Sequence, residues 1–487
     1  MRFFRILFSL VLLALTACNT NNNEEQSLYI ISTNDMHASI EAMPRLATLV
    51  KEYEALGEVV VVDSGDRVTG NAYVDDDHRP GVPMIELMNE IGYDVVTLGN
   101  HEFDKGRDVL NQMVEASDFQ WVCANMCDLK GESKIKPYTT LDVAGIKLGI
   151  VGVVDTDFGG RPMGGDSSYV DFSFSDDRTT AYEVCREVAP NHDYTILLSH
   201  MGYEGDKRLA EMEPACNWIA GGHSHDVVGE DIGTVHLSQN RKDIRYATIA
   251  HLRAKGGEVL SVEFEQVELK DYEEDSGTRA IVDYIKSFDP TLNSVVTHAN
   301  ARANKDGIAN FTVDALMAYP YADGFEPEIA IYHYGGVRLT EIAEGKVKRV
   351  DILNNDPFVS TIYIGEMTLA EIRQFILDKY NNGTAERPDK ESHYAYFRAN
   401  VPYEIVLGNE PETAPDAVDI RFDIEERTYR VALCNYIAEN YIDKELVANK
   451  LRPISTTVRE AMLYLMESYG DKGFTPNNTV LQTEVKD

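Results

Sequence analysis

The stretch TLGNHEFDKG, residues 97–106, sets the fold class and points to the chemistry of this chain. An apolar segment from Tyr93 to Leu98 runs straight into Gly, Asn, His and Glu, and an Asp follows three residues after the His. A turn explains the Gly-Asn pair, but a turn needs neither the imidazole of His101 nor the carboxylate of Asp104. Such a cluster indicates a shared site if other apolar segments of the chain end in similar polar residues.

Four other apolar segments do so. They lead into STNDMHA, VVVVDSGDRVTG, TILLSHMG and NWIAGGHSHD. The polar residues at the five ends are Asp35, His37, Asp63, Asp66, Asn100, His101, His200, His223 and His225. A single His or Asp after a strand is more often structural, but five in succession are hard to assign to chance. Because the carboxyl ends of strands are where sites assemble in α/β folds, we expect these side chains to share one site.

The kinds of side chain at this site indicate its ligand. Imidazole, carboxylate and amide groups without clustered thiolates suit hard or borderline divalent ions. The ligand places exceed the needs of one ion. Two ions that share one carboxylate can hold the oxygens of a transferring phosphoryl group, so a dinuclear centre is expected.

The order of elements predicts the fold class. Strand-like runs alternate with segments such as PRLATLVKEYEAL, whose apolar residues recur at helical spacing. The predicted strands are 28–33, 59–62, 93–98, 146–153, 194–198 and 218–220. This alternation favours an α/β layered fold. A second half begins near residue 290, and its clearest helix follows Thr368 and is expected to end at Gly383.

Composition excludes some classes of partner. The 487 residues are too many for one ordinary domain, and the formal charge of −36 makes a nucleic-acid polymer an unlikely ligand because like charges repel. A small phosphate ester could still bind where metal ions set the local field. The cysteines show no disulfide spacing, and Cys123 and Cys127 lack further ligands at metal spacing, so buried free thiols are favoured.

The first residues predict export. Arg2 and Arg5 precede an apolar run that ends in Leu-Thr-Ala-Cys, which is too short for a stable membrane span. This end resembles a bacterial lipobox, in which Cys18 becomes the lipidated first residue; an ordinary secretory signal is the alternative. We expect a signal peptide at 1–17, a flexible tether at 18–27, and a lipid-anchored protein on a bacterial membrane, periplasmic or at the cell surface.

The five blocks NDMH, GDRVTG, GNHEFDKG, SHMG and GGHSH resemble the signatures of calcineurin-like dinuclear metallophosphatases, and more narrowly the bacterial 5′-nucleotidase/UDP-sugar hydrolase family. The resemblance implies a four-layer α/β/β/α sandwich and two divalent ions, which could be Zn, Mn, Fe, Co or Mg. It gives one ion Asp35, His37, Asp66 and His225, and the other Asp66 (bridging), Asn100, His200 and His223. His101 matches the catalytic His, Asp104 would orient it, and a metal-bound water would be the nucleophile.

The second half resembles the 5′-nucleotidase C-terminal domain through VDALMAY, GGVRLTEIAEGKV and DILNNDPFVSTIYIGEMTLAEI. Arg338 stands where the family has a phosphate-binding Arg, and Phe397 and Tyr436 match the aromatic pair that sandwiches the nucleobase. His333 replaces the family's Asn before the Gly-Gly, and the Gly-Gly-Asp-Gly-Tyr loop is absent. These departures affect the substrate pocket and leave the metal ligands in place.

The sequence thus predicts a metallophosphatase domain at 28–275, a linker helix at 276–290, and an α/β substrate-binding domain at 291–487. The expected reaction is hydrolysis of a phosphoester, most simply a nucleoside 5′-monophosphate. A 2′,3′-cyclic nucleotide or a nucleotide sugar remains an alternative substrate. A lipoprotein that binds a ligand or metal without turnover is the alternative outside enzymes, although a positioned His101–Asp104 pair has no use in a mere binder.

Overall fold

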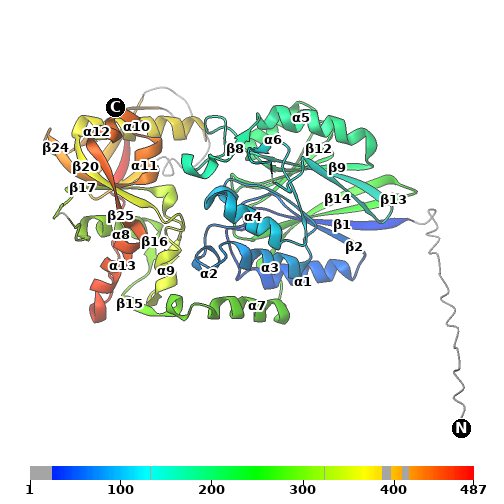
Figure 1. Ribbon diagram of the computed structural model, residues 1–487, viewed down its shortest axis with the longest axis horizontal. Coiled ribbons are helices and arrows are strands. Elements are labelled where there is room, and N and C mark those ends of the chain that lie inside the picture. The colour runs from blue at the N-terminus through cyan, green and yellow to red at the C-terminus, as the bar shows by residue number, and fades with distance from the viewer. Residues whose placement is uncertain (1–24, 132, 323, 387–395, 409–415, 487) are drawn as a thin grey trace, which may run out of the picture.

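The computed structural model describes residues 25–131, 133–322, 324–386, 396–408 and 416–486, which form two lobes side by side (Figure 1). The predicted lipidation site, Cys18, lies outside the described residues. Among the residues described, no helix combines the length and the apolar character that crossing a membrane requires.

The N-terminal lobe contains two six-stranded mixed sheets. The first has the order β14 (Glu258–Glu268), β13 (Tyr246–Lys255), β1 (Gln26–Thr33), β2 (Glu58–Asp63), β3 (Val95–Thr97), β4 (Gln120–Val122). The second has the order β11 (Val227–Ile232), β12 (Val235–Asn240), β10 (Trp218–Gly221), β9 (Tyr194–His200), β7 (Ile146–Val154), β6 (Tyr138–Val143). All six strands predicted above are present within these sheets.

Side-chain alternation explains why the two sheets pack face to face. Along β1, Leu28 and Ile30 point into the core between the sheets, whereas Ile31 packs into the core under the helices. The inner core also holds Ile196 and Trp218 from the second sheet. Both faces of the central strands are therefore covered, which is why these strands read as continuous apolar runs.

Helices cover the two outer faces (Figure 1). On the first sheet lie α1 (Met43–Glu54) and α3 (Val82–Ile91), with α4 (Gly106–Ala116) and α7 (Ser276–Ser287) beside them. On the second lie α5 (Asp177–Val188) and α6 (Tyr203–Glu211). The order of layers is helix, sheet, sheet, helix, which confirms the predicted sandwich.

The C-terminal lobe is a second α/β layer structure around a five-stranded sheet. Its order is β21 (Phe397–Ala399), β17 (Ile329–His333), β24 (Thr428–Cys434), β20 (Thr361–Thr368), β25 (Leu451–Thr457). One face carries α8 (Lys305–Ala318), α9 (Arg349–Leu353) and α13 (Val458–Ser468); the other carries α10 (Leu369–Glu386), α11 (Asn435–Asn440) and α12 (Lys444–Lys450). A small sheet is formed by β23 (Ala417–Phe422), β22 (Tyr403–Leu407) and β26 (Gln482–Lys486).

Helix α10 corrects one sequence expectation. Thr368 and Glu371 form the predicted reciprocal hydrogen bonds at its start, at 2.8 and 3.3 Å. The helix does not end at Gly383 but continues to Glu386. A glycine lowers helix stability by only about 1 kcal/mol, which neighbouring turns can offset.

The two lobes touch near α2 (Ala72–Asp75), and α7 runs between them (Figure 1). The backbone N–H of Ala72 donates to Asn354 Oδ1 at 2.8 Å, and Arg459 pairs with Asp76 at 2.6 Å. Arg459 is almost fully buried, so this ion pair fixes the two lobes at one point. The predicted domain limits at 275 and 291 stay a prediction.

Candidate metal centre

The predicted site residues gather at one edge of the N-terminal lobe because the strands that carry them run parallel. β1, β2 and β3 are parallel neighbours in the first sheet, and β9 and β10 are parallel neighbours in the second. Their carboxyl ends therefore open on the same side, as in other α/β folds. The seven candidate metal ligands, Asp35, His37, Asp66, Asn100, His200, His223 and His225, lie in the loops at these ends or, for His200, at the last strand residue.

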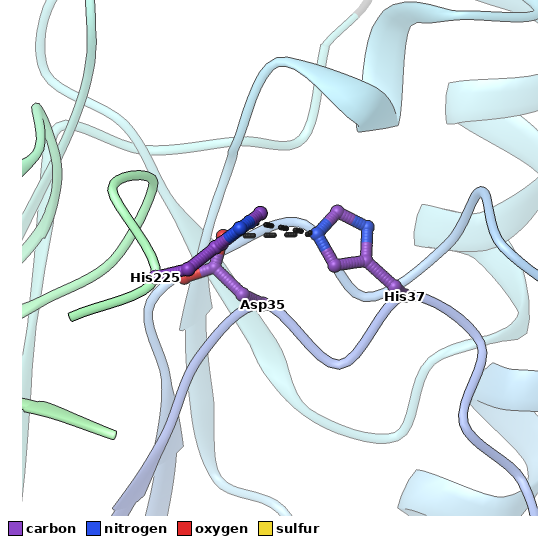
Figure 2. Close-up of side chains that lie close together, drawn as sticks. All are labelled: Asp35, His37 and His225. Carbon is purple, nitrogen blue, oxygen red and sulfur yellow. Dashed lines mark hydrogen bonds and ion pairs between the residues drawn. The ribbon is translucent and has the colours of Figure 1, made fainter. Parts of the chain in front are cut away.

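The candidate ligands form two groups, one around Asp35 and the other around Asp66. In the first, His225 Nε2 lies 3.3 Å from Asp35 Oδ1 and 3.1 Å from His37 Nε2. Figure 2 shows these three side chains converging, Asp35 and His37 from one loop and His225 from a distant segment of the chain. In the second, Asp66 Oδ2 lies 3.1 Å from His200 Nε2. Ligand atoms of Asp66, His200 and His223 all fall within 4.8 Å of one another.

Two buried atoms indicate that these groups suit a cation. Asp35 Oδ1 and His200 Nε2 are fully buried and have no hydrogen-bond partner among the described residues. A buried carboxylate oxygen and a buried imidazole nitrogen that make no hydrogen bond are costly, and divalent ions bound to them would remove that cost. Oxygen and imidazole donors of this kind fit Zn, Mn, Fe or Mg, so the residues present fit the predicted metal.

The backbone at the candidate ligands is strained. Asp35, His37, Asp66, His223 and His225 all have positive φ, between 45° and 78°. Such values are uncommon for residues with a side chain and cost of order 1–3 kcal/mol each where the conformation is poorly populated. Five such residues in one site indicate that the loops are shaped to aim their side chains inward.

Hydrogen bonds to backbone carbonyls orient the imidazoles. Nδ1 of His37 lies 3.1 Å from Thr69 O, and Nδ1 of His200 lies 2.6 Å from Ser64 O. Each contact places the proton on Nδ1 and leaves Nε2 facing the centre as a lone-pair donor. Burial, with Arg338 acting in the same direction, lowers the pKa of His37 well below its ordinary value, so its ring is neutral.

His101 and Asp104 form the predicted pair beside the ligands. Nδ1 of His101 lies 2.8 Å from Asp104 Oδ2, and the backbone N–H of His101 donates to Asp66 Oδ1 at 2.8 Å. Thr69 Oγ1 also donates to Asp104 Oδ2, at 2.7 Å. Burial lowers the pKa of His101, but the carboxylates of Asp66 and Asp104 outweigh it, so the pKa is raised and the protonated ring is favoured.

Asp63, which the sequence placed among the strand-end candidates, does not face the centre. Its Oδ1 accepts hydrogen bonds from Arg67 Nε at 3.2 Å and Nη2 at 3.0 Å. Both side chains are fully buried, and the Arg67 guanidinium lies 4.3 Å from the Trp121 ring centroid. Asp63 therefore serves as the partner of a buried Arg in the support beneath the site.

Glu102 is a functional residue that the sequence reading left without a role. One carboxylate oxygen accepts from the N–H of Gly99 at 2.6 Å and of Asp66 at 3.0 Å, and the other accepts from the N–H of Arg67 at 3.0 Å. The side chain is 1% exposed. Glu102 thus ties the loop that carries Asp66 to the loop that carries Asn100 and His101. Its place next to His101 was the one available signal.

We expect Glu102→Gln to weaken metal binding by about 10–100-fold, the usual effect of losing a residue that orients a ligand. The amide keeps one acceptor oxygen, so at least one of the three N–H groups loses a charged partner. Activity measured against metal concentration should shift to higher metal and recover in excess. Glu86→Gln, on the exposed face of α3, is the matched control. An unchanged metal midpoint for Glu102→Gln would contradict the assignment.

The C-terminal lobe places two side chains against this centre. Arg338 Nη2 lies 3.2 and 3.3 Å from the two ring nitrogens of His37. Phe358 lies over His101, with ring centroids 5.7 Å apart, and the Arg338 guanidinium lies 5.5 Å from the same Phe358 ring. Arg338 thus stands beside the metal ligands, whereas Phe358 was missed because nothing in the sequence links it to His101.

The predicted base-binding residues divide into two kinds. His333 and Tyr436 lie together with ring centroids 4.6 Å apart, and both are partly exposed. Phe397 is fully buried, with its ring centroid 5.7 Å from that of Phe375 and 5.5 Å from that of Tyr441. The Phe397 ring is buried in this structure and its centroid lies 6.1 Å from that of the His333 ring, and its predicted stacking role stays a prediction.

Family comparisons cover both lobes. The calcineurin-like phosphoesterase family matches residues 28–227, and the 5′-nucleotidase C-terminal domain matches residues 286–443. The chain is 24% identical over 507 residues to a 5′-nucleotidase of Vibrio vulnificus, which covers 89% of each protein. It is 24% identical over 518 residues to the trifunctional nucleotide phosphoesterase protein YfkN of Bacillus subtilis, covering 88% of this chain but about a third, 34%, of that longer protein.

Solved structures share the fold across both lobes. A 5′-nucleotidase precursor from Thermus thermophilus superposes with a TM-score of 0.79 at 20% identity, covering 94% of this chain and 99% of that one. The sulfate thiohydrolase SoxB of Thermus thermophilus gives a TM-score of 0.75 at 15% identity, covering 94% and 96%. Because proteins named for different reactions share this fold, the bond that is cleaved has to be argued from the residues.

Proposed function

The chain belongs to the family that joins a calcineurin-like phosphoesterase domain to a 5′-nucleotidase C-terminal domain, and from this premise we propose that it hydrolyses nucleoside 5′-monophosphates to nucleoside and phosphate. One observation carries the proposal: ligand-type side chains gather in adjoining groups beside the His101–Asp104 pair, and two of their buried atoms, Asp35 Oδ1 and His200 Nε2, make no hydrogen bond among the described residues. The printed names of the relatives, nucleotidases and nucleotide phosphoesterases, support the substrate class.

We assign two divalent ions to the centre. Asp35, His37, Asp66 and His225 would hold one, and Asp66, Asn100, His200 and His223 the other. Asp66 belongs to both sets because its carboxylate groups with His37 of the first set and with His200 and His223 of the second. When bound, such ions lower the pKa of water and neutralise charge on phosphoryl oxygens.

The chain's own residues supply the proton and the orientation. The Nδ1–H of His101 donates to Asp104, so Nε2 faces the centre and can give a proton to the departing oxygen of the substrate. Arg338 presents a guanidinium fork next to His37, a geometry suited to two phosphoryl oxygens. Phe358 covers His101 on the side of the C-terminal lobe and keeps water from that face of the ring.

The C-terminal lobe would hold the rest of the nucleotide. Tyr436 and His333 offer partly exposed rings on which a base can stack, and stacking tolerates different bases. A 2′,3′-cyclic nucleotide or a nucleotide sugar would use the same centre with a different fit at this end. A binding lipoprotein without turnover would leave the His101–Asp104 pair without purpose.

We also propose that the protein works outside the cytoplasm, tethered through a lipid on Cys18. The basic, apolar and small-residue pattern of residues 1–17 supports export, and the polar stretch from residue 18 to the start of β1 at Gln26, shorter than the expected 18–27, would serve as a tether. Nucleotide scavenging would be the use of such an enzyme.

The test is phosphate release from the full-length protein with AMP, UMP, a 2′,3′-cyclic nucleotide, UDP-glucose and an aryl phosphate. We expect release to be fastest with the 5′-monophosphates, to stop with a chelator, and to return with added Mn or Zn, because the carboxylates and imidazoles of the centre bind these ions. Release from the aryl phosphate alone would keep the metal centre and reject the nucleotide pocket. Release that a chelator leaves unchanged would reject the metal centre.

A further inference from the structure

The loop at residues 69–71, directly before α2, is held in one conformation by a single buried carboxylate. Asp75 is 2% exposed, and its Oδ1 accepts a hydrogen bond from the backbone N–H of Thr69 at 3.0 Å. Its Oδ2 accepts from the backbone N–H of Gly70 at 2.7 Å and from that of Asn71 at 2.8 Å. A buried carboxylate is costly unless donors surround it, so any shift of the loop away from Asp75 is opposed.

Thr69 contacts two parts of the candidate site from this loop. Its φ of 65° is uncommon for a β-branched residue, and its side chain is buried. A Cβ on the following Gly70 would lie 2.3 Å from the carbonyl oxygen of His37, so only glycine lets the two segments pack this closely. The carbonyl oxygen of Thr69 accepts from Nδ1 of His37 at 3.1 Å, and the Thr69 hydroxyl donates to Asp104 Oδ2 at 2.7 Å. Thr69 thus holds a candidate metal ligand with its carbonyl and the partner of His101 with its hydroxyl.

Asp104 needs this second contact more than the candidate metal ligands would. Its side chain is 21% exposed, whereas that of Asp66 is 2% exposed. Among the residues that the structure describes, its carboxylate has two hydrogen-bond partners, Nδ1 of His101 at 2.8 Å and the hydroxyl of Thr69, and both meet Oδ2. A partly exposed carboxylate with so few contacts keeps rotational freedom. The Thr69 hydroxyl removes that freedom and keeps Oδ2 turned toward the imidazole.

We propose that Thr69 is a positioning residue for the reaction, whose hydroxyl holds Asp104 so that Asp104 fixes the ring of His101. The inference rests on the proposed function, in which His101 gives a proton to the departing oxygen. Orientation matters for that step, because displacing a reacting group by about 1 Å can cost roughly 10²-fold in rate. Since the carbonyl of the same residue holds His37, one loop supports both the proton donor and a candidate metal ligand.

Thr69→Val is the sharpest variant, because valine keeps the branched shape and the backbone carbonyl and removes only the hydroxyl. We expect kcat for AMP to fall roughly 10–100-fold, the loss of a hydrogen bond to a charged group expressed as a rate, with KM within about twofold of the wild type. Thr69→Ser keeps the hydroxyl and should restore most of the activity. Calorimetric titration with Mn should be unchanged in both variants, because the carbonyl still accepts from His37. Thr140→Val is the matched control, since this exposed Thr on β6 has its hydroxyl 2.8 Å from His192 Nε2.

Two further comparisons separate positioning from a structural role. In an Asp104→Ala background, Thr69→Val should cause no further loss of kcat, because the hydroxyl no longer has the group that it holds. With an aryl phosphate, whose leaving group departs without a proton, Thr69→Val should lower kcat by less than about threefold. Independent losses in the double variant, equal losses with AMP and the aryl phosphate, or loss of metal in Thr69→Val would each overturn the proposal.

The proton on His101 Nδ1 gives a readout that needs no turnover. In protein labelled at histidine nitrogens, its NMR signal is identified by its loss in His101→Ala. We expect this signal to broaden through faster exchange with water in Thr69→Val and to return in Thr69→Ser, because a freely rotating Asp104 protects the proton less. An unchanged signal in Thr69→Val would show that the hydroxyl does not hold the pair. Failure of the wild type to hydrolyse AMP would instead refute the nucleotidase function, while the NMR comparison still decides on Thr69.

Discussion

Replacement of His101 by alanine is expected to lower kcat for AMP by about 10²–10⁴-fold, the usual contribution of a positioned general acid or base. The protein should keep its metal, because His101 Nε2 lies 3.8 Å from Asp66 and the seven candidate ligands remain. The backbone N–H of residue 101 still donates to Asp66 Oδ1 in the variant, so the loop keeps its anchor. Metal content by elemental analysis and steady-state rates are the two measurements.

The leaving group separates the possible roles of His101. A nucleoside alkoxide needs a proton to depart, whereas an aryl oxide does not, so the loss should be much smaller with an aryl phosphate if His101 is the acid. His78→Ala is the matched control, because this His is exposed and pairs with Asp77, which is not among the candidate ligands. Activity within a few fold of the wild type, or loss of metal in His101→Ala, would show that the role is wrongly assigned.

The sequence was sufficient for the fold class and for the segments that become the central strands of the first lobe. A buried parallel strand appears in the sequence as a continuous apolar run, and the run stops where the strand leaves the sheet. The first polar residues after the run therefore mark the edge of the sheet at which the loops meet. Asp35 and His225 are far apart in sequence, yet the same reasoning brings them together, and their side chains lie 3.3 Å apart. The topology of the two sheets makes that contact necessary.

Contacts that depend on packing between distant segments could not be predicted from the sequence. Phe358 covers His101 only because the second lobe sits against the first, and no local pattern records that. The burial of Phe397 follows from the packing of Phe375 and Tyr441 around β21, and its sequence motif fits a core aromatic as well as a base-stacking one. The positive φ angles of Asp35 and Asp66 could not be predicted from the sequence either, because they are known only from the backbone coordinates.

Asp63 and Asp66 show how similar residues in one loop acquire different tasks. Asp63 ends β2 and Asp66 stands three residues later; both are carboxylates and both are buried. Asp63 meets Arg67 at 3.0 Å, whereas Asp66 Oδ2 meets His200 at 3.1 Å and lies 3.8 Å from His101. The difference comes from the turn at Gly65, whose φ of 92° reverses the chain between the two.

Asp66→Asn is therefore expected to lower metal affinity by at least about 100-fold and to abolish turnover at ordinary metal concentrations. The exchange removes the charge that both proposed ions would share, while the amide keeps the size and one acceptor for the His101 N–H. Since weakening a residue that merely orients a ligand costs about 10–100-fold, losing a shared ligand should cost more. Calorimetric titration with Mn or Zn, followed by phosphate release in the same samples, measures both effects.

Asp63→Asn is the contrasting variant in the same loop. Removing the charge of one partner in a buried ion pair costs about 3–5 kcal/mol when the other charge is left uncompensated, and Glu102, 3.5 Å from Arg67, should reduce that cost. This variant should unfold at lower temperature yet bind the same number of ions per chain. Asp66→Asn should show the opposite pattern, with lost ions and little loss of apo-protein stability. If both variants lose metal in proportion to stability, Asp66 is a structural residue and the proposed shared ligand has to be sought elsewhere.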